Sequence, residues 1–313
     1  MRAQENFISI EGYLYNHKLV ERTVQNKESK MYGQTFIGGT VNVAVDEEGM
    51  NVIEVRYNFI TPTTKDGSPN RTYNTLAKII KENPTWLAVG KENCEKVSIT
   101  RARLVENNFI GRDGQMVSAK SNEASFINIL DRQVSPENRF SVDIVLNGLR
   151  EIDEDPERGL DAYAVLKGYV FDFRNEAQQV ELTVRNADAI NYFAGLDLSN
   201  SNVVYTKVWG EINSTTVERK VEVPSAFGAP QIRTTTSTAK EWLVTGAQAE
   251  PYDFDDEGTI TADELRASLQ AREVRLAGVQ ERHDRQSTPA SAFAAGPTTP
   301  VSELIAKKGN FNF

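Results

Sequence analysis

Apolar and polar side chains alternate over much of the first 130 residues. In residues 7–15, Ile8, Ile10 and Leu14 fall on one face, which is the two-residue period of a strand buried on one side. The same period predicts strands over 35–46 and 51–60. Glu47-Glu48-Gly49 supplies a turn between those two, so the three strands are expected to form an antiparallel meander.

Outward and inward positions follow directly from this alternation. In the second strand Phe36, Thr40 and Asn42 point outward. In the third, Arg56 and Asn58 point outward and the opposite, inward face consists of apolar side chains: Ile53, Val55, Tyr57 and Phe59.

A helical period and two further strands follow. Residues 73–82 place Leu76, Ile79 and Ile80 on one side, and Pro84 ends the helix. Strands are then predicted over 96–105 and 124–131, separated by a long loop that contains Gly-Arg-Asp-Gly at 111–114. Three strands, a helix and two strands is the order of the OB-fold, a five-stranded Greek-key barrel.

The same order fits the next hundred residues, although no residue-level repeat links the two halves. Strands are predicted over 140–147, 162–174 and 180–185, a helix over 187–196, and strands over 203–213 and 216–223. The fold class is therefore mainly β, with two OB-fold-like five-stranded barrels in tandem, the first within residues 1–135 and the second within 139–245.

The C-terminal part has a different composition. Residues 224–238 are rich in Thr, Ser, Pro and Gly and are read as a linker or an irregular edge. Residues 241–265 hold eight acidic and no basic side chains, 262–282 suit a charged helix, and 287–300 are low in complexity. We expect residues 246–313 to form an acidic, partly helical and disordered tail.

Charge is distributed unevenly along the chain. The net charge is −9, yet residues 1–130 hold 16 basic and 15 acidic side chains, against 19 and 29 in the remainder. The acidic total therefore does not exclude a nucleic-acid-binding surface on the first barrel. A single cysteine, Cys94, points to a reducing compartment. With no signal peptide or membrane-spanning stretch, we predict a cytoplasmic protein.

Exposed aromatic and basic side chains on a small barrel are typical of single-strand binding, because bases stack on aromatic rings and phosphates attract cations. The outer face of strands two and three and the loops beside it bind ligand in OB-folds. The candidate binding residues are Tyr13, Tyr15, Lys18, Arg22, Lys27, Lys30, Tyr32, Phe36, Arg56, Asn58, Arg101, Arg103, Phe109 and Arg112. The alternative is that these aromatic side chains are covered by the linker or by the second barrel.

Two aromatic features of the second barrel favour burial. Tyr169, Phe171 and Phe173 alternate on one face, and an alternating aromatic row belongs more often to a core than to a binding platform. Trp209 is likewise assigned to the core or to the seam between barrels.

A twelve-residue acidic segment matches the spacing of an EF-hand calcium loop. Asp253, Asp255, Glu257 and Glu264 fall at loop positions one, three, five and twelve, with Gly258 at six. The preceding residues do not resemble an incoming helix. An acidic run that caps the following helix at Thr261 explains the same residues. The prediction is no cofactor, with calcium at this loop as the alternative.

Catalytic motifs are missing from the sequence. It contains no Walker loop, no Gly-x-Gly-x-x-Gly, no His-Glu-x-x-His and no Cys-x-x-Cys. We therefore predict a protein that is not an enzyme.

The chain resembles the single-stranded-DNA-binding proteins encoded by phages and mobile elements of Gram-positive bacteria. The resemblance is carried by Ile-Glu-Gly-Tyr-Leu-Tyr at 10–15, the strands at 36–45 and 52–60, and Val-Trp-Gly-Glu-Ile at 208–212. It covers roughly residues 1–250 and implies OB-fold binding of exposed strands during replication or recombination. The chain departs from the common bacterial ending, Ile-Pro-Phe, because Lys307 and Lys308 precede Asn-Phe-Asn-Phe.

The leading hypothesis is a non-sequence-specific single-stranded DNA-binding protein that acts in phage or mobile-element DNA replication or recombination. Its predicted partners are single-stranded DNA and, through the C-terminal tail, replication or recombination proteins, with no membrane. The acidic 250–264 stretch is a candidate mimic of nucleic acid that competes for the basic face of the first barrel. The alternative function is a structural or assembly protein that uses its barrels for protein contacts and self-association.

Overall fold

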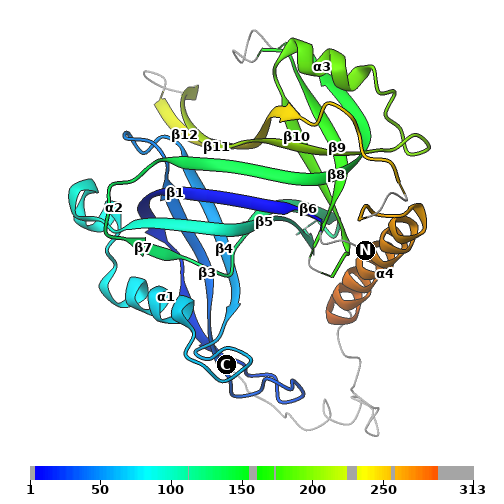
Figure 1. Cartoon of the computed structure of the whole chain (residues 1–313). Helices are drawn as coiled ribbons and strands as arrows, with labels where there is room; N and C mark the ends of the chain where they lie inside the picture. Colours follow the sequence, from blue (N-terminus) through cyan, green and yellow to red (C-terminus); the bar gives the residue numbers. More distant parts are fainter. Residues whose placement is uncertain are drawn as a thin grey trace, which may run out of the picture.

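The computed structural model describes residues 4–111, 113–154, 161–172, 174–223, 231–254 and 258–287; of 215–223, 231–238 and 285–287 it describes the backbone alone. The chain is mainly β, as predicted (Figure 1). The strands are β1 (Asn6–His17), β2 (Val20–Thr23), β3 (Thr35–Ala44), β4 (Val52–Ile60), β5 (Lys96–Ile110), β6 (Met116–Glu123), β7 (Asn128–Leu130), β8 (Glu137–Ile152), β9 (Tyr163–Phe171), β10 (Ala177–Val184), β11 (Val204–Val223) and β12 (Gln231–Ala247). The helices are α1 (Arg71–Glu82), α2 (Trp86–Val89), α3 (Ala187–Ala194) and α4 (Ala262–Ser287), with a 3₁₀ turn at Lys91–Asn93.

Five strands close into a first ring in the order β1–β3–β4–β6–β5 and back to β1. The β4–β6 pair is parallel and the other pairs are antiparallel. α1 lies between the third and fourth strands of this ring in the chain and buries Leu76 and Ile79, as the helical period predicts. This strand order with one parallel closure is that of an OB-fold.

A second ring repeats the arrangement in the order β8–β9–β10–β12–β11 and back to β8. β10 and β12 form its parallel pair, and α3 again lies between the third and fourth strands in the chain. The prediction of two OB-fold-like five-stranded barrels is therefore confirmed by strand pairing.

The two rings share one sheet and one core. The first half of β1, Asn6 to Glu11, pairs with Val142 to Glu137 of β8. Ile8 to Tyr13 of the same strand pair with β5, and Tyr13 to His17 pair with β3, so β1 belongs to the first ring and joins it to the second. Buried side chains of both rings belong to a single hydrophobic cluster. Trp242 of the second ring contacts the first ring, because its indole Nε1 donates to Oδ1 of Asn122 on β6 at 3.1 Å. The rings are thus packed as one body.

Two glycines of the resemblance segments mark close strand crossings. A Cβ at Gly12 would lie 2.2 Å from the Ala44 carbonyl oxygen, and a Cβ at Gly210 would lie 1.9 Å from that of Leu243. No other residue fits without moving the neighbouring strand, because real Cβ atoms do not approach so closely. Both glycines allow a ring to close tightly.

Two hairpins correct the sequence prediction. The long loop predicted after residue 105 is the end of β5 and all of β6, which turn at Gly111 to Gln115. The fifth strand of the first ring is therefore β6 and not residues 124–131, which hold only the short β7. The alternation was missed because most side chains on both faces of this hairpin are polar.

In the second ring, the two strands predicted over 203–213 and 216–223 are one strand, β11 (Val204–Val223), and the closing strand is β12. The latter begins at Gln231, inside the stretch predicted as a linker. Its Thr-rich start is better read through the strand preference of β-branched side chains than through turn composition.

The C-terminal segment docks on the outer face of the second ring (Figure 1). Ile260 and Leu265 pack with Phe171, Tyr205 and Val145 in a second buried cluster. The predicted helix is thus confirmed as α4, and Phe171 is buried as expected, although Phe173 lies outside the described residues. Trp209 is 42% exposed, so its assignment to the core is wrong.

The described ends of the acidic segment pack on this second ring as well. Tyr252 forms a bridge with Tyr205, and its hydroxyl donates to Asp143 Oδ1 at 3.3 Å. These contacts place the described ends of the acidic segment on the second ring. The hypothesis that the segment competes with nucleic acid requires it to lie on the basic face of the first barrel. The predicted disordered tail after residue 287 lies outside the described residues.

Candidate nucleic-acid interface

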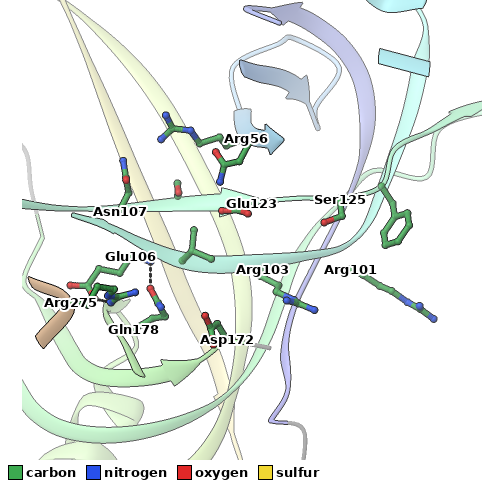
Figure 2. A pocket seen from close by; sticks show the side chains of 14 residues that line it. Arg56, Arg101, Arg103, Glu106, Asn107, Glu123, Ser125, Asp172, Gln178 and Arg275 are labelled. Carbon is green, nitrogen blue, oxygen red and sulfur yellow. Dashed lines mark hydrogen bonds and ion pairs between the residues drawn. The ribbon is translucent and has the colours of Figure 1, made fainter. Parts of the chain in front are cut away.

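Four of the predicted binding residues lie together in one cleft of about 540 Å³ (Figure 2). Arg56 and Asn58 come from β4, and Arg101 and Arg103 come from β5. We call this the arginine cleft. It lies on the outer face of the first ring, and its far wall comes from the second ring and α4.

Strand alternation and one bulge aim these side chains. β4 buries Ile53, Val55 and Tyr57, so Arg56 and Asn58 are exposed on the opposite face. On β5 the register with β1 shifts between the pairs Ile8–Ala102 and Ile10–Ile99. Arg101 lies in this bulge with a φ of 60°, an uncommon backbone conformation for a residue other than glycine. Bulges redirect side chains in this way, and Arg101 is brought to the cleft beside Arg103.

A carboxylate lies between the arginines. Arg56 of β4 is aligned with Glu123 of β6, which is aligned in turn with Arg103 of β5. Burial raises the pKa of Glu123 above its ordinary value, although the two arginines act in the opposite direction. Cation, anion and cation therefore form a row across the cleft, and Glu123 opposes the binding of any further anion.

The far wall is fastened by a buried ion pair. Glu106 of β5 has no exposed side-chain surface. It accepts from Arg272 of α4, with Nε to Oε2 at 3.0 Å and a second bond from the other guanidinium nitrogen to Oε1. The backbone amide of Gln179 and the Ser118 hydroxyl also donate to the Glu106 carboxylate, at 3.0 and 2.9 Å. Burial alone would raise the pKa of Glu106, but these bonds outweigh it and hold that pKa below its ordinary value.

This ion pair sets the position of α4 at the cleft. Arg275, one turn after Arg272, lies 3.5 Å from Glu106 Oε2 and lines the cleft together with Gln178. In Figure 2 Arg275 and Gln178 are drawn at one end of the cleft, and Arg101 and Ser125 at the other. The cleft therefore runs from α4 toward the far end of the first ring.

Phe36 forms a stacked pair with Phe59, with ring centroids 4.4 Å apart and planes inclined by 28°. The sequence prediction placed Phe59 inside the barrel, and this is wrong, because its side chain is 39% exposed. The register between β3 and β4 shifts between the pairs Ile37–Ile60 and Gly39–Tyr57. One extra residue on β4 reverses the alternation after Asn58.

The basic loop before Phe36 is exposed and partly ordered as a hairpin. β2 was predicted as loop, and it places Arg22 directly opposite Phe36. The remaining loop candidates are all exposed side chains: Lys18, Lys27, Lys30 and Tyr32. The structure thus brings Arg22 to the aromatic pair and leaves the others at the surface around it.

Tyr13 and Tyr15 lie elsewhere. Tyr13 pairs with Ala44 at the end of β3, whereas Phe36 is at its start, about 25 Å away along an extended strand. Both tyrosines are half-buried against Trp86, each with ring centroids 5.8 Å apart in edge-to-face geometry. Lys91 lies 5.2 Å from the Tyr13 ring centroid. The predicted binding residues Tyr13, Tyr15 and Phe36 are therefore divided between two aromatic sites.

The β5–β6 hairpin holds Phe109, which is not among the described residues that line the cleft. Phe109 is exposed near the hairpin turn and pairs with Val117. Arg112 lies outside the described residues. Phe109 extends the basic face only if the hairpin itself contacts the ligand.

Sequence reasoning missed Phe126, which is exposed and lines the arginine cleft. The sequence did hold a signal, because Phe126 and Ile127 are adjacent apolar residues and cannot both face the core of a strand. In the structure Ala124 and Ile127 are buried, so the two-residue period predicted for this stretch does not hold and Phe126 points outward.

The sequence of this chain matches the model of the YorF family over residues 5–277. The chain belongs to the YorF family. No curated protein is similar to it in sequence.

Among solved structures, the YorF-family chain is similar to the wild-type single-stranded DNA binding protein from Thermus aquaticus. The identity is 14% and the TM-score 0.43, over 81% of this chain and 96% of that one. A deletion mutant of that protein gives the same identity and TM-score over 98% of its length. Replication Protein A bound to single-stranded DNA is similar at 11% identity and a TM-score of 0.21, over 85% of this chain and 70% of that chain. The fold assignment rests on the strand order of the two rings.

At the acidic loop of this YorF-family chain, the described residues form a helix cap. The Thr261 amide donates to Glu264 Oε2 at 3.0 Å, and the Glu264 amide donates to Thr261 Oγ1 at 3.1 Å. This reciprocal pair is a capping box, as the alternative interpretation expects. Asp255 and Glu257 lie outside the described residues, so a calcium site with Asp253 stays a prediction. Among the residues that are described, no three His, Cys, Asp or Glu side chains are placed to hold a metal ion.

Within the described part of the chain, no helix has the length and apolar character needed to cross a bilayer.

Proposed function

We propose that this chain binds single-stranded DNA, with little sequence preference and without catalysis, along the outer face of its first ring. The observation that carries the proposal is the arginine cleft. Side chains predicted from two separate segments, Arg56 with Asn58 and Arg101 with Arg103, converge there on the outer face of β4 and β5. Of these strands, β4 is the third strand of the ring and belongs to the face that binds ligand in OB-folds.

The charges of the cleft are available to an anion. Arg56 and Arg101 are exposed, and neither forms an ion pair with any residue that the structure describes. The chain as a whole carries 44 acidic and 35 basic side chains, so two such arginines in one cleft are not explained by general surface composition. A phosphate accepts from guanidinium groups in charge-assisted hydrogen bonds.

Aromatic rings lie near this charge. Phe59 is the next residue after Asn58 on β4, and its ring stacks on that of Phe36. Phe36 in turn lies opposite Arg22 of β2. Base stacking on aromatic rings tolerates any sequence, because every base has a π-face. Tyr13, Tyr15 and Trp86 form a second aromatic site at the other end of β3, where a longer strand would be met by Lys91.

The cellular setting is part of the proposal and is supported by the sequence resemblance. We place the activity in the replication or recombination of phage or mobile-element DNA in the cytoplasm. The tail after residue 287 would contact other replication or recombination proteins, and self-association would extend coverage of a strand.

The test is a fluorescence-anisotropy titration of the full chain with labelled oligo-dT at low and at moderate salt, with duplex of equal length as the control. We expect tight binding of the single strand, weakened by salt because bound phosphates release counterions. Equal affinity for the duplex, or no binding at low salt, would contradict the proposal. Self-assembly without nucleic acid would then favour the structural alternative.

Replacing Glu123 by Gln is expected to raise affinity for oligo-dT several-fold at neutral pH, because it removes the anion between Arg56 and Arg103. Because the pKa of Glu123 is raised by burial, the weakening of binding by its charge should also depend on pH. As pH falls through that pKa the carboxylate is protonated, so wild-type affinity should rise, while the variant should respond less. Titrations between neutral and mildly acidic pH measure both, with Glu82→Gln on α1 as the control. A variant with unchanged affinity would remove Glu123 from the binding site.

A further inference from the structure

The ring of Phe126 separates two cavities. Its side chain is 53% exposed and lines the arginine cleft on one side. On the other side it lines a second cavity of about 580 Å³, between the start of α1 and the β7 segment. None of the residues proposed above lies in this second cavity.

The backbone around Phe126 is held firmly although its ring is exposed. Ala124 and Ile127 are both buried. The Ala124 amide donates to the Arg56 carbonyl at 2.9 Å, and the buried Tyr57 hydroxyl donates to the Phe126 carbonyl at 3.2 Å. An aromatic ring presented from a fixed backbone loses little conformational entropy when a base stacks on it.

The second cavity combines the chemistry that a nucleotide requires. Arg71 lies on its wall, exposed and without an ion pair to any residue of the described chain. Thr75 and Asn128 add polar groups, and the buried Ile127 adds an apolar surface. A guanidinium, hydrogen-bonding groups and an apolar patch beside an aromatic ring suit one phosphate and one base.

We propose that the single strand leaves the arginine cleft across Phe126 and continues into the second cavity, where Arg71 contacts a phosphate. This extension rests on the proposed function and adds a subsite beyond it. It predicts that Arg71 acts only on oligonucleotides long enough to pass the cleft, and that Phe126 contributes more to the binding of these than to that of shorter ones.

The test measures affinity as a function of length, with oligo-dT from about 4 to about 20 nucleotides, a range that spans the site sizes of single OB-folds. Phe126→Ala should lower the affinity of the longer oligomers about 5- to 140-fold, the range of one lost stacking contact, and that of the shortest bound oligomers by a smaller factor. Arg71→Gln should act on the longer oligomers and reduce the slope of log affinity against log salt by about 0.7. Lys81→Gln, at the other end of α1, and Tyr192→Ala, an exposed ring on α3, are the controls.

The outcomes separate the two proposals. Length-dependent losses in both variants, with unchanged controls, support the second subsite. Equal losses at all lengths, or no losses, overturn it while wild-type binding still stands. If the wild-type chain binds no oligonucleotide of any length, the subsite and the proposed function fail together.

Discussion

The double variant Arg56→Gln, Arg101→Gln is expected to lose about 100- to 20,000-fold in affinity for oligo-dT at low salt. Each arginine is exposed and lies in the cleft without an ion pair to a described residue, so each is available for a charge-assisted bond to phosphate. Hydrogen bonds to charged groups contribute about 1.5–3 kcal/mol each, and about 1.4 kcal/mol is tenfold in affinity. Neither change removes a buried contact, and thermal stability should be nearly unchanged.

The salt dependence of the same titrations checks the mechanism. For a single strand the slope of log affinity against log salt is about −0.7 per phosphate neutralised, so the double variant should have a slope shallower by about 1.4. The matched control is Arg139→Gln, Arg150→Gln, which removes two exposed arginines from β8. If the control loses as much affinity as the cleft variant, binding depends on overall charge and not on the arginine cleft.

The variant Glu106→Gln is expected to lower the free energy of unfolding by about 3–5 kcal/mol, the cost of breaking a buried ion pair by removing one partner. Arg272 would lose its anion, and Arg275 would lose the interaction that holds it at the cleft. Denaturant unfolding at neutral pH measures the loss, and faster tryptic cleavage within α4 would report its release. Glu82→Gln removes an exposed pair with Lys78 and should cost well under about 1 kcal/mol.

The pH dependence of this loss has a definite sign. The native pKa of Glu106 lies below its ordinary value of 4.5, so the ion pair contributes fully above that ordinary value and less as pH falls through the native one. The difference between wild type and variant should therefore be large at neutral pH and shrink in acid. A difference that stays constant down to strongly acidic pH would show that Glu106 acts through packing alone.

Much of the first ring follows from the sequence, since one buried face per strand fixes which side chains point outward. Arg56 and Asn58 were predicted from alternation with Ile53, Val55 and Tyr57, and the structure places them so. The order of strands and helix predicted the OB-fold in both halves, although the fifth strand of each ring lies at other residues than those predicted.

What the sequence did not predict depends on register and on distant contacts. The bulge opposite Ile37 turned Phe59 outward to meet Phe36, and a one-residue shift leaves no trace in composition. The separation of Tyr13 from Phe36 follows from the β1–β3 register. The bond between Glu106 and Arg272 joins residues 166 positions apart, and nothing in the sequence near either residue predicts this pairing.

The central claim is that a single strand lies in the arginine cleft, and photo-crosslinking tests it most directly. An oligo-dT carrying 4-thiothymidine would be bound to the full chain, irradiated and digested, and the crosslinked peptides identified by mass spectrometry. We predict crosslinks in the peptides that contain Arg56 to Phe59 and Arg101 to Arg103. Crosslinks confined to the second ring or to α4 would contradict the account.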